Sequence, residues 1–189
     1  SLLSIHASEQ QIAGKGRNGK KWISPKGKNI YISIGWLSDL NYSQLDGLSL
    51  AIGTILASSL NKLTQNKVGI KWPNDLLIKN KKISGILIET IDINNKIGVV
   101  IGIGINVHMS EEEGKEIDQS WISLDQVTDS INDRNKIIAD IVNKVYQLTS
   151  LFAKEGFKPY KLEYELLDML KGKRCIVNIK DVHKTVDVL

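Results

Sequence analysis

Two hydrophobic periods alternate along this chain, and each predicts its own kind of element. Short runs rich in β-branched and aromatic residues indicate strands, whereas an apolar residue at every third or fourth position indicates a helix. The strand pattern covers residues 29–36, 68–71, 75–78, 83–90, 97–107, 174–180 and 184–189. The helical pattern covers residues 43–65, 133–155 and 160–170. The first dozen residues show neither period, so no element is assigned to them.

Capping and stop signals support the two long helices. Ser43 and Asp46 resemble a capping box at the start of the first helix. The second helix ends at Gly156, and Pro159 follows shortly after. Its apolar stripe consists of Ile137, Ile138, Ile141, Val145, Leu148 and Phe152. Residues 110–120 are polar and acidic without a period, which indicates a loop.

The order of these elements predicts an α+β fold. A strand, a helix, several strands and a second helix fit a mainly antiparallel sheet with helices packed on one face. Short turns at residues 80–81 and 94–95 join neighbouring strands. The last two strands resemble the beginning of a small β module. We therefore expect a main domain over residues 1–170 and a second, incomplete one over residues 171–189.

Composition narrows the class of protein. The chain has 189 residues, of which 42% are hydrophobic and 24% charged, as in an ordinary globular domain. Its formal net charge is +4, and much of the excess lies between Lys15 and Lys28, which favours a local anion site over a basic surface. The single cysteine, Cys175, excludes an intrachain disulfide and a cysteine-based zinc cluster. The single cysteine also favours a reducing compartment, so we expect a cytoplasmic protein. No apolar run approaches the ~18 residues of a membrane span, so we expect no membrane partner.

Residues 14–22 form a glycine-rich basic stretch that ends on Trp22. Three glycines and four cations occupy it. Glycine allows sharp turns and close approach to backbone N–H groups, and neighbouring cations can complete a site for phosphate or carboxylate. A solvated basic loop, or a nonspecific nucleic-acid patch, is the alternative. The tryptophan favours a site, because a solvated loop has no reason to end on a large apolar ring.

A second motif, Lys-Trp-Pro-Asn-Asp, occupies residues 71–75. Proline ends the preceding strand, so Asn74 and Asp75 lie at a defined turn. An ordinary Asn-Asp turn explains this pattern. A carboxylate there could also hold Mg²⁺, which uses one or two carboxylates together with substrate phosphates.

Two glycine-bearing strands follow. Lys82 begins a strand that carries Gly85, and glycine inside a strand indicates close approach by a ligand or another backbone. Gly102 and Gly104 alternate with isoleucine, so both lie on one face, against which a flat group can pack. Asn106 ends this strand with a donor and an acceptor available. A tight contact between helix and sheet would explain the alternating glycines equally well.

Together these four motifs resemble the catalytic domain of biotin–protein ligases. The family's Gly-Arg-Gly-Arg-x-Gly-Arg-x-Trp loop resembles residues 14–22, and its Lys-Trp-Pro-Asn-Asp motif matches residues 71–75 without change. Its Lys-[Leu/Ile]-[Ala/Ser]-Gly-Ile-Leu and Gly-x-Gly-x-Asn motifs match residues 82–87 and 102–106. The resemblance extends over roughly residues 8–180, and the four motifs occur in the family's order.

The resemblance implies an activity and its partners. The family has a class II synthetase-like α+β fold followed by a small SH3-like domain. It activates biotin with ATP and Mg²⁺ to biotinyl-5′-AMP, and then transfers biotin to one lysine of a biotin carboxyl carrier protein. Cations at the site would neutralise the charge that develops when a carboxylate meets a polyphosphate. The resemblance leaves a homodimer open, and it implies DNA as a partner only where a helix-turn-helix domain precedes Ser1.

Carried over residue by residue, the resemblance assigns roles. The catalytic residues would be Lys82, at the biotin carboxylate and the bridging phosphate, and Arg17, at the acyl-adenylate. Biotin would contact Gln11, Lys15, Gly16, Arg17, Trp22, Lys82 and Gly85. The nucleotide and its phosphates would contact Lys20, Lys21, Asn74, Asn106 and Trp121. Asp75 would hold Mg²⁺.

The sequence also departs from the family. Lys15, Asn18 and Lys20 stand where the family often has arginine, and lysine lacks the planar bidentate geometry of a guanidinium. The family's Ser/Thr-Thr-Asn segment does not appear. A lipoate or octanoate ligase relative shares the fold and a catalytic lysine, and a nucleic-acid-binding module is a further alternative. Against the second, the aromatic residues do not alternate with the cations as stacking platforms require.

Overall fold

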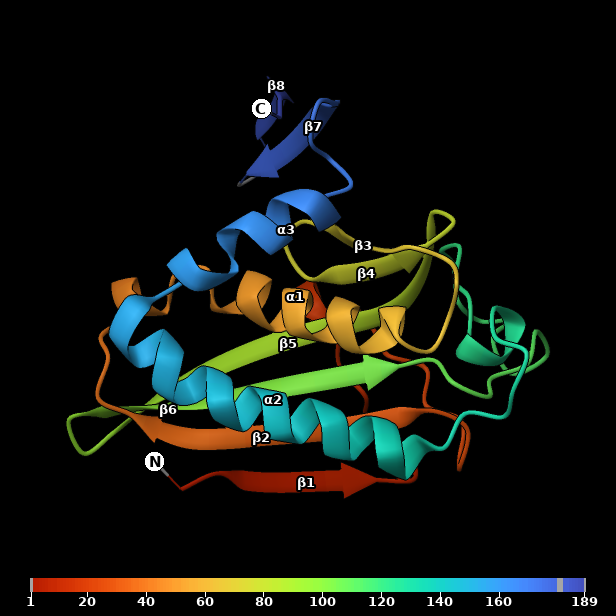
Figure 1. Cartoon of the computed structure of the whole chain (residues 1–189), viewed down its shortest axis with the longest axis horizontal. Coiled ribbons are helices and arrows are strands. Elements are labelled where there is room, and N and C mark those ends of the chain that lie inside the picture. The colour runs from red at the N-terminus through yellow and green to blue at the C-terminus, as the bar shows by residue number, and fades with distance from the viewer. Residues whose placement is uncertain (1, 180–181, 189) are drawn as a thin grey trace.

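The computed structural model describes residues 2–179 and 182–188, and its centre is a six-stranded sheet. The strands lie in the order β1-β2-β6-β5-β4-β3, and every neighbouring pair is antiparallel (Figure 1). Their bounds are β1 (Ser4–Ser8), β2 (Ile30–Ser38), β3 (Val68–Lys71), β4 (Asp75–Ile78), β5 (Lys81–Ile93) and β6 (Lys96–Ile105). Two further strands, β7 (Arg174–Ile179) and β8 (Val182–Asp187), form a separate sheet.

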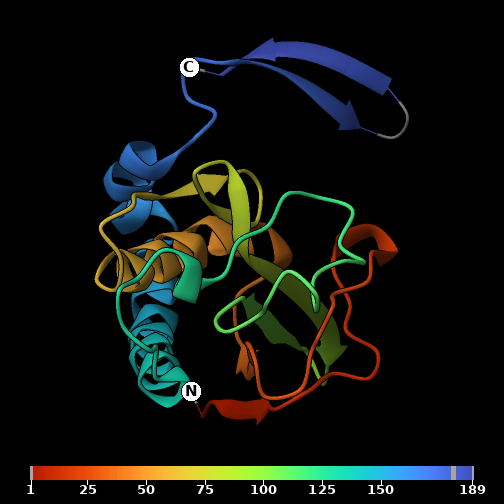
Figure 2. The same ribbon diagram turned by 90° about the vertical axis from the view of Figure 1, so that its right-hand side faces the viewer.

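The three α-helices of the described residues cover the same face of the central sheet (Figure 1). They are α1 (Leu48–Asn61), α2 (Arg134–Glu155) and α3 (Lys161–Leu167), and 3₁₀ turns lie at Arg17–Gly19, Tyr42–Leu45, Leu124–Gln126 and Lys158–Tyr160. Figure 2 shows the long loops after β1 and after β6 on the side opposite these helices. The predicted α+β architecture is therefore confirmed, and the loops that carry the sequence motifs occupy the helix-free face.

Side-chain alternation explains this division of the sheet. Ile34 of β2 and Ile101 and Ile103 of β6 are buried in the core against the helices. Each such isoleucine contributes about 1.5–3 kcal/mol on burial. The alternate positions of β6 include Gly102 and Gly104, so the opposite face of the same strand carries no side chains there. One strand thus supplies both the core and an open platform.

The start of α1 differs from the prediction. Ser43 and Asp46 do not cap it: the capping box in this region begins at Asn41 and belongs to a 3₁₀ turn. The N-cap of α1 is Gly47, whose φ of 85° is left-handed. A Cβ at this position would lie 2.8 Å from Phe157, so both the backbone and its surroundings require glycine.

The second long helix begins and ends as predicted. The Asp133 carboxylate accepts from Asn135 N at 2.9 Å and Lys136 N at 3.3 Å, which satisfies two of the free N–H groups at the start of α2. Gly156 ends α2 with a φ of 60°. The predicted apolar stripe lies in the core, with Ile138 partly buried at its edge.

Strands lie close to the two ends of the chain. Residues 1–12, left unassigned, contain β1, an edge strand with every residue exposed. The predicted strands 174–180 and 184–189 correspond to β7 and β8, although Lys180 and Leu189 lie outside the described residues. Among the described residues, none of the helices combines the length and the apolar character that a membrane span requires.

Candidate active site

Two cavities lie on the loop-bearing side of the sheet and share one wall. The larger has a volume of about 550 Å³ and the smaller about 230 Å³. Five residues line both cavities, namely Gly16, Arg17, Trp22, Asn74 and Lys82. Three of them carry polar groups suited to anions, so the shared wall can contact a charged group presented from either side.

The shared wall centres on an ion pair between Lys82 and Asp75. Lys82 Nζ lies 2.8 Å from Asp75 Oδ1, and the two side chains are only 16% and 24% exposed. The β4–β5 hairpin brings the residues together across a register shift at Leu76 and Leu77. Asp75 Oδ1 is buried and has no hydrogen bond of ordinary geometry to the described residues, so the lysine charge compensates it. A charged ammonium is thereby held at the boundary of the two cavities.

The indole of Trp22 packs on the face of the sheet that carries Gly85 and Gly104. A Cβ at Gly104 would lie 2.5 Å from the indole ring, and one at Gly85 would lie 3.0 Å from it. The flat group that packs on these glycines is therefore the indole of the chain itself, and a helix contact does not explain them. Lys82 Nζ lies 5.3 Å from the centre of the same ring, within the range of a cation–π contact. The indole Nε1 is buried and has no hydrogen-bond partner among the described residues.

The glycine-rich loop is a compact turn held by its own backbone. Gly16 N donates to Lys20 O at 2.7 Å, and Trp22 N donates to the carbonyl of Gly14 at 2.9 Å. Between them Asn18 adopts a left-handed φ of 56°. This turn directs Arg17 toward the shared wall, where its Nη1 donates to Asn74 Oδ1 at 3.3 Å. Lys20 and Lys21 line the larger cavity on the same side.

The smaller cavity is lined by Gly102, which lies on the same face of β6 as Gly104 but is not covered by Trp22. A Cβ added at Gly102 would make only ordinary van der Waals contacts, the nearest with Leu87 O at 3.6 Å. Leu87 and Gly85 of β5 also line it, and Gln11 and Lys15 line it from the glycine-rich loop. The cavity therefore combines an apolar floor with polar groups at its rim, as small-molecule sites do.

A second loop, residues 106–123 after β6, borders the larger cavity. Trp121 lines the cavity and packs so closely on Gly114 that a Cβ there would collide with its ring. Asn106 also lines it, but its amide Nδ2 donates to Ile122 O at 3.2 Å and to Lys82 O at 3.4 Å. The first contact connects the end of β6 to the far end of the loop, and the second connects it to the start of β5. Asn106 therefore has a structural function that the sequence did not indicate.

Acidic residues of the second loop face lysines of the glycine-rich loop. Lys21 Nζ lies 3.7 Å from Glu116, and Lys28 Nζ lies 3.5 Å from Glu113. Hydrogen bonds from the backbone and side chain of Ser110 lower the pKa of Glu113, and Lys28 adds to the effect against partial burial. Because these carboxylates neutralise part of the basic loop, the arrangement does not favour the nucleic-acid alternative.

All residues that the sequence proposed for the site line one of the two cavities. They are Gln11, Lys15, Gly16, Arg17, Lys20, Lys21, Trp22, Asn74, Asp75, Lys82, Gly85, Asn106 and Trp121. Sequence reasoning missed the lining residues Trp72, Glu116, Ser33, Leu87 and Glu89. Trp72 lies inside the Lys-Trp-Pro-Asn-Asp motif and is 52% exposed, so its motif was a usable signal. Leu87 likewise ends the motif of residues 82–87, and Glu116 lies in the predicted loop 110–120, whereas Ser33 and Glu89 became visible only from the fold.

The Mg²⁺ expected at Asp75 does not fit the donors found there. Asp75 Oδ1 is paired with Lys82, and Asn74 Oδ1 accepts from Arg17. The described residues also contain no group of three His, Cys, Asp or Glu side chains placed to hold a metal. Asp75 Oδ1 and Asn74 Oδ1 already face cationic side chains, so these two oxygens do not form a ligand set for Mg²⁺.

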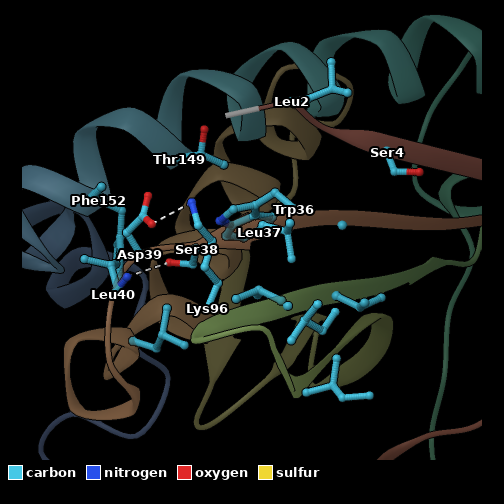
Figure 3. Close-up of a pocket in the computed structure, with 18 residues that line it drawn as sticks. Leu2, Ser4, Trp36, Leu37, Ser38, Asp39, Leu40, Lys96, Thr149 and Phe152 are labelled. Atoms are coloured by element: carbon cyan, nitrogen blue, oxygen red, sulfur yellow. Dashed lines mark hydrogen bonds and ion pairs between the residues drawn. The ribbon is translucent and has the colours of Figure 1, made fainter.

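A distal cavity of about 700 Å³ lies at the other end of the sheet (Figure 3). The end of β2, the β5–β6 hairpin and the last turns of α2 surround it. Its lining is mainly apolar, including Leu37 and Phe152, and a 2.8 Å ion pair between Lys96 and Asp39 lies within it. It contains none of the predicted site residues, so the chemistry indicated by the motifs lies in the other two cavities.

Several curated proteins are similar to this chain in sequence. Bifunctional ligase/repressor BirA of Escherichia coli is 40% identical over 181 residues, which are 93% of this chain and 55% of that protein. Biotin–[acetyl-CoA-carboxylase] ligase of Mycobacterium tuberculosis is 32% identical, over 73% of this chain and 51% of that protein. The chain thus spans about half the length of these curated relatives.

Solved structures share the fold. Biotin protein ligase from Aquifex aeolicus, in complex with biotin and ATP, matches with a TM-score of 0.73 and 24% identity, over 96% of this chain and 84% of that one. The Leishmania major enzyme in complex with biotinyl-5-AMP matches with a TM-score of 0.71 and 18% identity, over 94% and 80%. Residues 3–106, more than half of this chain, match the biotin/lipoate A/B protein ligase family model. The chain that carries these motifs around two adjoining cavities therefore belongs to the biotin/lipoate A/B protein ligase family.

Proposed function

We propose that this chain carries the catalytic machinery of a biotin–protein ligase. The observation that supports this most is the wall shared by the two cavities, which places Lys82 and Arg17 between them. A ligase of this kind must bring a carboxylate and a polyphosphate together, and both are anions. In this proposal biotin occupies the smaller cavity and ATP the larger one, with their reacting ends at the shared wall.

In the first step a carboxylate oxygen of biotin attacks the α-phosphorus of ATP. The new bond gives biotinyl-5′-AMP, and the bond to the β-phosphate breaks, so that pyrophosphate leaves. Lys82 and Arg17 stabilise the negative charge that develops around the phosphorus. Asp75 and the Trp22 ring keep the Lys82 ammonium in place before the substrates arrive, which limits reorganisation in the transition state.

In the second step the ε-amine of a carrier lysine attacks the acyl carbon of biotinyl-5′-AMP. The bond between the acyl carbon and the bridging oxygen breaks, AMP leaves with that oxygen, and the amine loses a proton. We propose a biotin carboxyl carrier protein as the acceptor, as the names of the ligase relatives suggest. Lys82 would again stabilise charge on the leaving phosphate.

We propose that Mg²⁺ enters as part of the MgATP substrate, with phosphate oxygens and water as its ligands. Asp75 would then serve Lys82 and not the metal, since its Oδ1 lies 2.8 Å from the ammonium. When bound, the metal supplies positive charge at the polyphosphate. The cations of the chain neutralise the α-phosphate and the biotin carboxylate.

Side-by-side substrate assays test this function. The alternative is lipoate or octanoate activation, which the family description also covers. Purified protein is incubated with MgATP and either biotin, lipoate or octanoate, and pyrophosphate release is followed. Release with biotin supports the proposal, whereas release with lipoate or octanoate and none with biotin would replace it.

Three further expectations remain proposals. We propose that residues 1–170 form the catalytic domain and residues 171–189 the start of an SH3-like domain, consistent with the separate β7–β8 sheet.

We propose a homodimer, because exposed Leu37, Ile91 and Val100 border the distal cavity and could be covered by a second copy of the chain. Sedimentation at micromolar concentration tests this. A cytoplasmic location is in keeping with the single cysteine. The repressor activity in the name of BirA is a property of that relative and is not carried over.

A further inference from the structure

Hydrogen bonds join the end of the glycine-rich loop to the start of the second loop. We define the glycine-rich loop as residues 9–29, between β1 and β2, and the second loop as residues 106–123, after β6. Asn29 is fully buried: its Oδ1 accepts from Val107 N at 2.9 Å, and its Nδ2 donates to Met109 Sδ at 3.4 Å. His108 N also donates to Lys28 O at 2.9 Å. Two segments about eighty positions apart in the sequence thus share one anchor.

Arg134, the first residue of α2, closes this anchor. Its Nη1 donates to the carbonyl oxygen of Asn29 at 3.0 Å, and its Nη2 pairs with Glu9 Oε2 at 2.9 Å. Glu9 and Asn29 are the two ends of the glycine-rich loop, and Gly27 N donates to Glu9 O at 2.9 Å. The guanidinium side chain is 23% exposed, so the charge-assisted contact is partly shielded from water.

We propose that Arg134 is a positioning residue that fixes the glycine-rich loop and the second loop to α2 as one unit. The proposal rests on the function given above, in which these loops supply Arg17 and Trp22 on one side and Trp121 on the other. The helix is a firm support, because five of its six buried residues are large apolar side chains packed in the core. Arg134 acts through the loops and lines neither cavity.

The expected effect is on binding and not on chemistry. Ordering a loop costs conformational entropy, and a ligand that must order two independent loops binds more weakly than one that meets a single preordered unit. Lys82 and Asp75 stand on the β4–β5 hairpin, outside both loops. Once both substrates are bound and the loops are ordered, the reacting groups are the same with or without Arg134.

The primary experiment measures pyrophosphate release by Arg134→Met, which keeps an unbranched apolar stem and removes both contacts. We expect KM for biotin and for ATP to rise about tenfold with kcat within about twofold of wild type. Arg134→Lys should give intermediate KM values, because an ammonium can reach one of the two acceptors. Lys136→Met is the matched control: it also lies in the first turn of α2, but it is 87% exposed and its ion-pair partner is Asp133.

A second measurement is independent of the substrates. Trypsin can cut the glycine-rich loop after Lys20 and Lys21 and the second loop after Lys115, and the fragments are identified by mass spectrometry. In Arg134→Met all these sites should be cut several-fold faster than in wild type, while Lys136→Met should match wild type. Glu9→Gln removes the charge from the Arg134–Glu9 contact at a position that is 63% exposed, and it leaves the bond from Arg134 to the Asn29 carbonyl in place. It should therefore raise the cleavage rates in the same direction but by less, even if Arg134→Met lowers overall stability.

The outcomes separate the two proposals. Unchanged cleavage rates in both Arg134→Met and Glu9→Gln would overturn the positioning role. So would a fall in kcat at unchanged KM, because this would place Arg134 in the chemistry. If wild-type protein released no pyrophosphate with biotin, the proposed function would fail, and the cleavage rates would still decide whether Arg134 holds the loops.

Discussion

The open floor of the smaller cavity makes Gly102→Ala a sharp test of where biotin lies. A Cβ at Gly102 would point from the sheet into this cavity, and its nearest neighbours in the protein are Leu87 O at 3.6 Å and Leu87 Cβ at 3.7 Å. These are ordinary van der Waals distances, so the protein itself accommodates the methyl group. A ligand that lies flat on the glycine floor would collide with it.

The structure sets the size of the effect. Extra carbon in a closely fitted apolar site costs about 1–3 kcal/mol, and 1.4 kcal/mol corresponds to about a tenfold change in affinity. Biotin should therefore bind roughly five- to 150-fold more weakly to Gly102→Ala. Stability should stay level or rise by about 0.4–1 kcal/mol, because alanine restricts the unfolded chain and the Gly102 backbone lies in a regular strand.

Gly35→Ala is the matched control. Gly35 lies on the neighbouring strand β2 opposite Val100, and a Cβ there has equally ordinary contacts, the nearest at 3.5 Å. Gly35 borders the distal cavity and not the smaller one. Calorimetric titration with biotin measures affinity, and thermal unfolding of the same samples measures stability. We expect weaker binding only in Gly102→Ala and no loss of thermal stability in either variant.

Two results would refute this reasoning. Wild-type affinity for biotin in Gly102→Ala would mean that the ligand does not lie on this part of the floor. Equal loss of affinity in both variants would mean that alanine acts through the sheet as a whole.

Three further predictions follow from the same site. Lys82→Met should reduce adenylate formation by orders of magnitude and also destabilise the fold, because it leaves the Asp75 carboxylate uncompensated; adding Asp75→Asn should restore the urea midpoint but not pyrophosphate release, and near-normal turnover in either variant would remove Lys82 from its role. Gly104→Ala should displace the indole of Trp22, which would lie 2.5 Å from the new Cβ, and should shift tryptophan fluorescence and lower activity together; an unchanged spectrum would contradict this placement of the ring. The pKa of Glu113 is lowered from 4.5, so its carboxylate stabilises the fold above that pH and less as pH falls through the folded-state pKa; the stability deficit of Glu113→Gln should therefore be full at neutral pH and shrink below about 4.5, whereas a deficit that grows on acidification would contradict the assignment.

Regular packing made most of the fold predictable from the sequence. The apolar period of α2, its N-cap Asp133 and its stop at Gly156 are all local to one segment. The helix in the structure has the bounds that these signals predict. By contrast, β1 has all five residues exposed, so an edge strand of this kind leaves no hydrophobic period to detect. The start of α1 depends on Phe157, which approaches Gly47 from more than a hundred positions away. A local capping pattern could not reveal that contact.

The candidate site divides in the same way. The motifs marked residues that line the cavities, because four of them in one order resemble a ligase family even though each motif alone has an ordinary structural explanation. What each residue touches could not be predicted: Asp75 faces Lys82 across a hairpin, and Trp22 fills the platform of Gly104. Arg134 carries no motif at all, since its partners Glu9 and Asn29 become neighbours only in the folded chain.

An oxygen-labelling experiment tests the central claim most directly. Biotin with ¹⁸O in both carboxylate oxygens is incubated with the protein, MgATP and an acceptor amine, and the released AMP is analysed by mass spectrometry. Attack of the carboxylate on the α-phosphorus at the shared wall, followed by aminolysis at the acyl carbon, predicts one ¹⁸O in the phosphate of each AMP and one retained in the amide product. AMP without label, formed while biotin is consumed, would contradict the account.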